Sequence, residues 1–466
     1  MTGQSFSWFG TTQISGVFPH LAVLADTLPH RTETGIGALM PWAEKLWFIT
    51  YVSSKRNAGA GVGLFTLDAT MQLTKRPESV VGCFANRMIH PQSHQLIIGP
   101  HIIDHKGNVR TFASLTQDVR LTAVMEHLED PENKVYFLGM EGEFFEANVH
   151  TLEVRWLMDV TKELGIERRP HFKDAYTGQG RVVVANNTYE ESDYLGQSAL
   201  GRLAEWDGNK WTIIETCQFN AVTGRRTGGG LSHAIFAAGA DNASAILKVR
   251  LNDAWQTYRL PKGTHTQDHT ITTEWPRIRE VESERWLINA SGMFYELPAM
   301  TYGGKVWGVR PICTHLRIIG DFCSWRGLLV LAGDQTTPIH DANAFVGQPQ
   351  ANLWFGKTDD LWQFGKPKGW GGPWRRTAVH ADEPSDPFLM TGFEHKCLHL
   401  SHDADRTVSF RLDVDFEGDG AWHPFETIDV PAHGYVCHVF PDGFSAHWVR
   451  LVPSASCTAS AIFHYT

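Results

Sequence analysis

Short runs of apolar residues, bounded by turn-forming residues, recur along almost the whole chain. Apolar and polar positions alternate within many of these runs, and the three-to-four-residue spacing of an amphipathic helix is scarce. Gly, Asn and Asp gather between the runs, where they favour tight turns. The pattern therefore predicts an all-β protein built from many short strands.

One larger pattern repeats: an apolar strand, a polar turn, and a second strand rich in Trp, Val or Leu. Its copies begin at Gly63, Gly99, Gly142, Gly201, Ala245, Gly292 and Asn352. Successive copies start roughly 36 to 60 residues apart, and four-stranded propeller blades repeat about every 40 to 50 residues. We therefore predict a seven-bladed β-propeller over residues 1–374, in which each copy supplies two strands of one blade. A large sandwich or a β-helix is the alternative.

The sequence changes in character after about residue 375. Residues 375–466 show six or seven strand-like runs separated by turn signals, which is typical of a jelly-roll or immunoglobulin-like β-sandwich. A Pro- and Gly-rich stretch, GKPKGWGGPW at 365–374, marks the predicted boundary. Such a module packs against its neighbour or binds sugar, and packing is our first expectation.

Composition and charge narrow the class of function. The chain has 466 residues and a formal charge of -10 at pH 7. A nucleic-acid partner is therefore not expected, because a phosphate-binding surface is normally basic. No apolar run approaches the roughly 18 residues of a membrane span, and no signal peptide is visible at the start. The seven cysteines are scattered and odd in number, which does not describe a disulfide framework.

Histidine stands out among the residues that could carry chemistry, with 23 copies. Familiar catalytic and phosphate-binding motifs are missing, and no organic cofactor is expected. The polar set around the histidines is Asn86, Arg87, His90, Asn186, Asn187, Arg202, Arg225 and Arg226. Such a set suits an acidic sugar, because Arg binds a carboxylate through two hydrogen bonds and His exchanges protons near neutral pH. A single His in a strand is more often structural, and we expect His94 and His105 in solvated turns.

A second group of residues has the character of metal ligands. It contains His265, His269, Cys313, His315, Cys323, His340 and Asp341. Cys and His are the usual ligands of zinc, but this spacing matches no standard zinc finger. The equal alternative is that Cys313 and Cys323 are small buried hydrophobic residues.

Several stretches resemble one group of proteins. They include GIGALMPWAEKLWFITYV at 35–52, NRMIHPQSHQLIIGPHIID at 86–104, LAEWDG at 203–208, ADEPSDPFLMTGF at 381–393 and FSAHWVR at 444–450. From about residue 35 to the end, the chain resembles a group of seven-bladed propeller proteins of polysaccharide breakdown. The group includes ulvan lyases, rhamnose-glucuronate lyases and the related gum-arabic rhamnosidases.

The resemblance implies a reaction and a set of site residues. The lyases of the group cleave the bond to a uronic acid by β-elimination, with His, Tyr and Arg on one propeller face and a structural metal held by His and Cys. The residues carried over by motif are His90 and Arg202 for catalysis, Tyr189 or Tyr194 as the tyrosine, and Asn186 and Asn187 as helpers. From the residues themselves, His101 is a further catalytic candidate, and Arg87 and Arg225 are further substrate-binding candidates. The metal, zinc or calcium, would be held by His265 and Cys323. A cysteine that the resemblance leads us to expect is Gly333 here, which leaves Cys313 or His340 to complete the site, or no site at all.

These observations predict a secreted or periplasmic lyase, with a cytoplasmic enzyme as the alternative location. The expected partner is an acidic, rhamnose-containing polysaccharide, cleaved at a rhamnose-uronate linkage. Two other functions stay open. One is an α-L-rhamnosidase that hydrolyses the same linkage at a different face of the propeller, with a first-blade histidine for which His20 and His30 are the candidates. The other is a propeller that binds sugar without catalysis.

Overall fold

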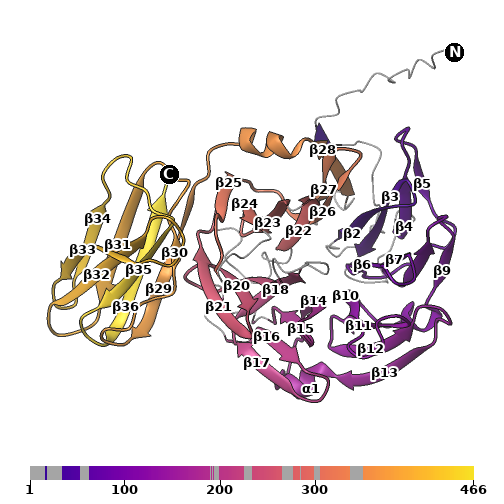
Figure 1. Cartoon of the computed structure of the whole chain (residues 1–466), viewed down its shortest axis with the longest axis horizontal. Coiled ribbons are helices and arrows are strands. Elements are labelled where there is room, and N and C mark those ends of the chain that lie inside the picture. Colours follow the sequence, from indigo (N-terminus) through magenta and orange to yellow (C-terminus); the bar gives the residue numbers. More distant parts are fainter. Residues whose placement is uncertain are drawn as a thin grey trace, which may run out of the picture.

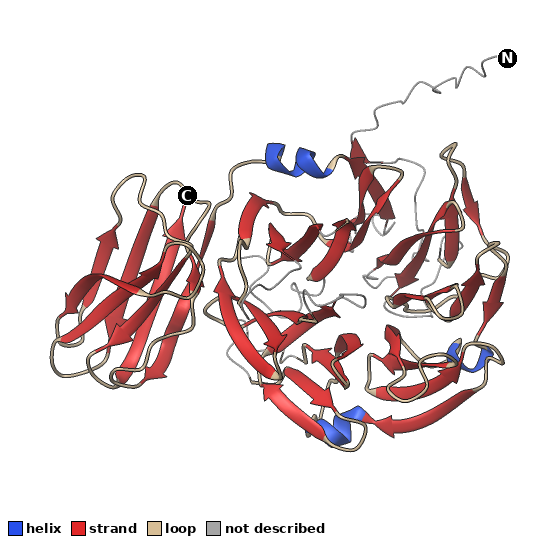
Figure 2. Ribbon diagram, in the orientation of Figure 1, coloured by secondary structure: helices blue, strands red, loops and turns tan. Residues whose placement is uncertain are grey.

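The structure is a computed structural model of the chain. It describes residues 16–17, 34–52, 62–188, 190, 193, 199–224, 233–264, 276–283, 285–298, 305–335 and 350–466. Strands dominate these residues (Figure 2). The helices among them are short: η2 (Ala113–Leu115), α1 (Val160–Leu164) and η5 (Thr358–Gln363). The prediction of an all-β chain is confirmed.

The repeated unit is a four-stranded antiparallel sheet in which strands consecutive in sequence are neighbours. Three such sheets are β2 (Thr34–Trp42), β3 (Lys45–Val52), β4 (Leu64–Leu67) and β5 (Leu73–Lys75); β6 (Arg87–His90), β7 (Gln95–Ile98), β8 (His101–Asp104) and β9 (Val109–Thr111); and β10 (Leu121–Glu126), β11 (Lys134–Gly139), β12 (Glu143–Asn148) and β13 (Val154–Asp159). Three more are β14 (Phe172–Gly178), β15 (Arg181–Asn186), β16 (Arg202–Trp206) and β17 (Trp211–Glu215); β18 (Gln218–Gly224), β19 (Ile235–Ala240), β20 (Ala245–Leu251) and β21 (Ala254–Leu260); and β22 (Arg277–Glu282), β23 (Arg285–Ala290), β24 (Met293–Pro298) and β25 (Arg310–Thr314).

A further sheet joins the two ends of this series. It consists of β26 (Ile319–Trp325), β27 (Leu328–Gln335), β28 (Gln350–Gly356) and β1 (Gly16–Val17), with β1 paired to β28. The sheets follow one another around a ring, and the first strand of each lies innermost (Figure 1). This is the arrangement of a β-propeller, in which the pairing of β1 ties the start of the chain to the last sheet of the ring.

The predicted second strand of the repeat that starts at Asn352 is wrong. The first strand of this repeat is present as β28, but the residues after it form the 3-10 helix η5. The Asp360 carboxylate accepts a hydrogen bond from the Lys357 backbone N–H at 2.8 Å, which satisfies a donor at the start of η5. The outer place in this sheet is taken by β1 instead.

Packing between adjacent sheets explains why many strands are continuous apolar runs. Every residue of β7 and of β19 is buried, because a neighbouring sheet covers each face. The inner strands come so close together that two positions accept only glycine. A Cβ on Gly37 would lie 2.0 Å from the Phe84 carbonyl oxygen, and one on Gly320 would lie 2.3 Å from that of Ile36.

The C-terminal part of the chain forms two further sets of strands beside the ring (Figure 1). One sheet has the order β29 (Gly369–Val379), β36 (Cys457–Tyr465), β31 (Lys396–His402), β34 (Tyr435–Val439). The other set has the order β30 (Phe388–Leu389), β35 (Trp448–Pro453), β32 (Val408–Asp415), β33 (His423–Val430). Strand β29 runs through the boundary predicted at residue 374, so the C-terminal strands begin by Gly369.

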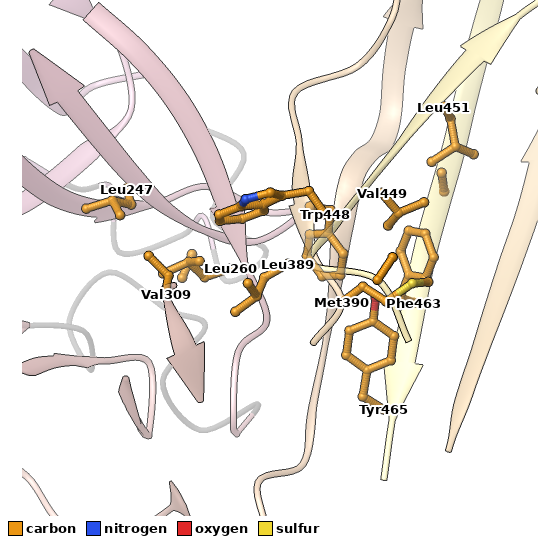
Figure 3. Packing of buried hydrophobic residues seen from close by; sticks show 14 of the residues in the cluster. Leu247, Leu260, Val309, Leu389, Met390, Trp448, Val449, Leu451, Phe463 and Tyr465 are labelled. Atoms are coloured by element: carbon orange, nitrogen blue, oxygen red, sulfur yellow. The ribbon is translucent and has the colours of Figure 1, made fainter. Parts of the chain in front are cut away.

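The C-terminal strands pack against the ring, as expected. Strand β30 pairs with β21 of the ring, so one sheet continues from the ring into the C-terminal part. Leu247 and Leu260 of the ring share a single hydrophobic cluster with Leu389 and Trp448 of the C-terminal strands (Figure 3). Ring and C-terminal strands therefore share one core.

Candidate functional site

The direction of the inner strands divides the ring into two faces. A parallel bridge between Phe84 and Leu121 shows that β6 and β10 begin at the same end. We call the end at which the innermost strands begin the start face, and the opposite end the end face. His101, Asn186 and Arg202 lie at strand termini on the start face, because they begin β8, end β15 and begin β16. The structure thus brings these three predicted residues to one face.

His90 does not join them, because it is the last residue of β6 and lies at the end face. Its side chain is buried, and both ring nitrogens have partners within the protein. Nδ1 lies 2.7 Å from the Ser93 hydroxyl and Nε2 lies 2.8 Å from the Pro131 carbonyl oxygen. This position fits a structural role in the β6–β7 turn rather than the predicted catalytic one. His94 and His105, expected in solvated turns, are exposed in turns.

His101 has the properties of a neutral base. Its ring is fully buried, and Nδ1 lies 2.9 Å from the Thr111 hydroxyl. Burial lowers the pKa of His101 to about 4, so the ring is uncharged at neutral pH. Nε2 has no hydrogen-bond partner. When Nδ1–H donates to Thr111, Nε2 carries a lone pair that is available to accept a proton.

Asn186, Asn187 and Arg202 present unpaired donors at the same face. Asn186 and Arg202 are partners on adjacent strands β15 and β16. The Asn186 side-chain oxygen Oδ1 accepts a hydrogen bond from the Thr188 N–H at 2.9 Å, and Asn187 Oδ1 lies 2.6 Å from His171 Nδ1. The Nδ2 atoms of both asparagines and Nε of Arg202 are buried without a partner. Unpaired buried donors are costly, so a ligand with acceptor oxygens would be favoured here.

A cavity of about 750 Å³ lies in the centre of the ring. The inner strands β2, β6, β10, β14, β18, β22 and β26 provide its walls, and charged side chains lie among the lining residues. We call this cavity the central funnel. Its size is that of a small-ligand site.

Arg87, predicted to bind substrate, lines the central funnel and forms an ion pair with Asp321. Arg87 Nε lies 2.7 Å from one Asp321 carboxylate oxygen, and Arg279 Nε lies 2.7 Å from the other. The Leu39 N–H donates to the same carboxylate at 3.0 Å. Burial alone would raise the pKa of Asp321, but Arg279 and Arg87 outweigh it and lower the pKa. The carboxylate therefore joins β2, β6, β22 and β26 as a charged group, which sequence reasoning missed.

Asp174 is the carboxylate of the central funnel with the opposite behaviour. Its oxygens accept hydrogen bonds from the N–H groups of Ala175 at 2.9 Å and Val222 at 3.1 Å. Burial nevertheless raises the pKa of Asp174, although Arg279 and Arg277 act against this. Glu126, Glu280 and Glu282 also line the cavity. The funnel thus combines a carboxyl group of raised pKa with three further carboxyl groups.

The two described members of the predicted metal site do not share a location. Cys313 packs in the cluster that contains Phe322, whereas Cys323 packs in the cluster that contains Ile36. Phe322 and Cys323 are adjacent in β26, so their side chains leave opposite faces of the strand. Burial raises the pKa of both thiols to about 12. These positions fit the alternative of small buried hydrophobic residues.

Four predicted site residues, Tyr189, Arg225, His265 and His340, lie outside the described residues, as do the first-blade candidates His20 and His30. Within the part of the chain that the structure describes, one group of metal-ligating side chains comes together, formed by Cys397, His399 and Cys437. Sequence reasoning missed it because Cys437 follows His399 only after two intervening strands.

Comparisons with known proteins add the following. No family model matches the chain, and no curated protein matches its sequence. Among solved structures, the β-propeller domain of Cps50 (Swd1) from Myceliophteria thermophila is 9% identical, with a TM-score of 0.42, over 73% of this chain and 98% of that chain. A luciferin-regenerating enzyme is 7% identical, with a TM-score of 0.35, over 72% of this chain and 95% of that one. No described helix has the length and apolar character needed to cross a membrane.

Proposed function

We propose that the protein is a secreted or periplasmic polysaccharide lyase that cleaves a rhamnose-uronate linkage by β-elimination. In this proposal the successive four-stranded sheets are the blades of a seven-bladed propeller, and the C-terminal strands are an accessory β-sandwich. The observation that carries the proposal is the start face. There, a neutral His101 with an unpaired Nε2 lies on the same face as the unpaired donors of Asn186, Asn187 and Arg202.

These groups match the needs of β-elimination at a uronic acid. Hydrogen bonds from Arg202 and the asparagine amides to the carboxylate would stabilise the negative charge that develops when the C5 proton leaves. His101 Nε2 would accept that proton. The C5–H electron pair then forms the C4–C5 double bond, and the C4–O bond breaks. Tyr189 is the proposed proton donor to the leaving oxygen. Because His101 is fully buried, the proposal requires the start face to open when substrate binds.

The test follows the unsaturated product. Incubation with ulvan or gum-arabic oligosaccharides should raise ultraviolet absorbance, because elimination creates a conjugated uronate and hydrolysis does not. His101→Gln and Arg202→Ala should each lower turnover by about 10²- to 10⁴-fold. His94→Gln, an exposed turn residue at the end face, is the matched control and should keep full turnover. Full turnover in both start-face variants would refute the site.

A second candidate function is favoured by the central funnel. Glycoside hydrolysis commonly uses a pair of carboxyl groups, and the central funnel contains Asp174, whose pKa burial raises, together with Glu280. A rhamnosidase would release free rhamnose without an absorbance change. Asp174→Asn should abolish this release, and His101→Gln should leave it unaffected. Binding of the oligosaccharides with no product at all would instead indicate a non-catalytic sugar-binding propeller.

A further inference from the structure

The outer face of the C-terminal sheet carries a cluster of cysteine and histidine side chains that the proposed reaction does not use. Burial alternates along β31, so that Cys397 and His399 face outward while Leu398 and Leu400 face the core. Strand β34 alternates in the same way and presents Tyr435 and Cys437 on the outer face. His399 and Cys437 are direct partners in the antiparallel pair. Two thiols and one imidazole therefore meet on adjacent strands.

We propose that Cys397, His399 and Cys437 form a zinc-binding site. Their ligand atoms all lie within 4.8 Å of one another, and Cys397 Sγ is 3.6 Å from His399 Nε2. Zinc bonds of about 2.3 Å to sulfur and 2.0 to 2.1 Å to nitrogen place tetrahedral ligand atoms about 3.6 to 3.8 Å apart. Small side-chain rotations from the observed positions would reach this geometry. Thiolate and imidazole are also the ligands that zinc prefers.

Tyr435 orients the imidazole for this role. His399 Nδ1 lies 2.7 Å from the Tyr435 hydroxyl, and the rings of the two residues stack. This contact occupies Nδ1 and leaves Nε2, the nitrogen nearest Cys397, as the metal ligand. A partner on the remote ring nitrogen is the usual arrangement around a metal-bound histidine.

The fourth position of the tetrahedron would be open to water. His464 on β36 is a neighbour of His399, with their ring centroids 5.1 Å apart. Three protein ligands with one open position are typical of zinc sites that also bind a small ligand. One ligand, Cys437, lies on β34, the edge strand of its sheet. Zinc would therefore tie an exposed edge strand to its neighbour β31.

The register favours a metal over a disulfide bond between the two cysteines. Cys397 is paired with Val439, and His399 is paired with Cys437, so the cysteines are diagonal neighbours. Diagonal Cα atoms are about 7 to 8 Å apart in an antiparallel pair, and disulfides usually need about 4.4 to 6.8 Å. A metal ion spans the longer separation because two metal–sulfur bonds replace one sulfur–sulfur bond.

The test uses the full chain, stripped of metal and reduced, and titrated with Co²⁺ and then Zn²⁺. We expect thiolate-to-cobalt charge-transfer absorption and a spectrum typical of tetrahedral cobalt, both removed by one equivalent of Zn²⁺. Cys397→Ser and Cys437→Ser should each lose one equivalent of bound zinc relative to the unmodified chain. Tyr435→Phe should keep the site but weaken zinc binding about 10-fold.

Cys457→Ser is the matched control, because Cys457 is another partly buried thiol of the same sheet, at the start of β36. This variant should bind zinc as the unmodified chain does. Unchanged zinc stoichiometry in both Cys397→Ser and Cys437→Ser would overturn the proposal, as would a cobalt spectrum without thiolate bands. A Cys397–Cys437 disulfide in the purified protein that takes up no zinc after reduction would overturn it as well. Each readout is independent of enzymatic activity.

Discussion

His315 is a buried side chain at the start face that its surroundings keep uncharged at neutral pH. Its Nε2 lies 2.8 Å from the Asn289 side-chain oxygen Oδ1. Burial lowers its pKa to about 4, and the charge of Arg317 also acts against protonation. In the unfolded chain a histidine has a pKa of about 6.5. The unfolded state therefore binds a proton between these values that the folded state does not.

This difference predicts that His315 makes stability depend on pH. The folded pKa is depressed, so its effect on stability is absent above about pH 6.5 and grows as pH falls toward 4. The loss is about 2 kcal/mol by pH 5 and about 3 kcal/mol below pH 4. His315→Gln should remove this part of the decline, measured as the urea-unfolding free energy at pH 7.5 and pH 5.

His105→Gln, in an exposed turn, is the control. An equal decline in His315→Gln and in the unmodified chain would contradict the assignment.

Sequence reasoning at this scale found side-chain types but not their partners. It singled out Arg87, and the structure pairs this residue with Asp321, 234 positions further along the chain. It singled out His90 because of the polar residues near it in sequence. In the structure, His90 ends β6 and lies at the end face, whereas His101 begins β8 and lies at the start face. Which face a strand terminus reaches depends on the strand's place in its sheet, and that place is fixed only when the sheets are assembled.

At the scale of elements, the close approach of inner strands limits what the sequence can contain. Gly320 in β26 has the Ile36 carbonyl oxygen 2.3 Å from the position of a Cβ atom. Gly327, in the turn after the same strand, has a φ of +80° but no atom within 4 Å. The first glycine is required by a neighbouring backbone, and the second only by its own conformation.

This contrast predicts unequal effects of alanine at the two positions. Gly320→Ala should lower the free energy of unfolding by about 3 kcal/mol, because the clashing atom belongs to backbone and cannot rotate away. Gly327→Ala should cost only about 1 to 2 kcal/mol, the price of a left-handed conformation for a residue with a Cβ. Urea denaturation of both variants measures the difference. Equal costs would show that the two inner strands separate easily.

The repeat pattern predicted strands well wherever one segment of chain supplies a hairpin. It predicted β12 with β13 and β20 with β21 in this way. It failed after β28, because β1 completes that sheet from more than 300 positions away in sequence. Local alternation carries no signal for a strand that arrives from the other end of the chain.

At the scale of the whole molecule, the ring and the C-terminal strands are joined by more than apolar contact. Arg259 in β21 forms ion pairs with Asp241 at 2.7 Å and with Asp386, just before β30, at 2.9 Å. Trp448 on β35 packs against Tyr258 on β21, with ring centroids 5.0 Å apart. The predicted change of module near residue 374 is therefore not a break in the core.

A shared core predicts that both parts unfold together. Trp448→Ala removes a buried ring at the contact with Tyr258 and should lower the free energy of unfolding by about 3 to 5 kcal/mol. Phe355→Ala, at a buried ring position in a different cluster of the propeller, is the matched control and should cost a similar amount.

If the core is continuous, calorimetry of each variant should show one transition, moved to lower temperature in both. Two transitions, one shifted by Trp448→Ala and the other by Phe355→Ala, would mean that the cluster in Figure 3 joins two units that fold separately. One transition would instead mean that a change in the C-terminal strands alters the stability of the start face. The connection runs through one sheet, because β30 pairs with β21, and β21 belongs to the same sheet as the inner strand β18.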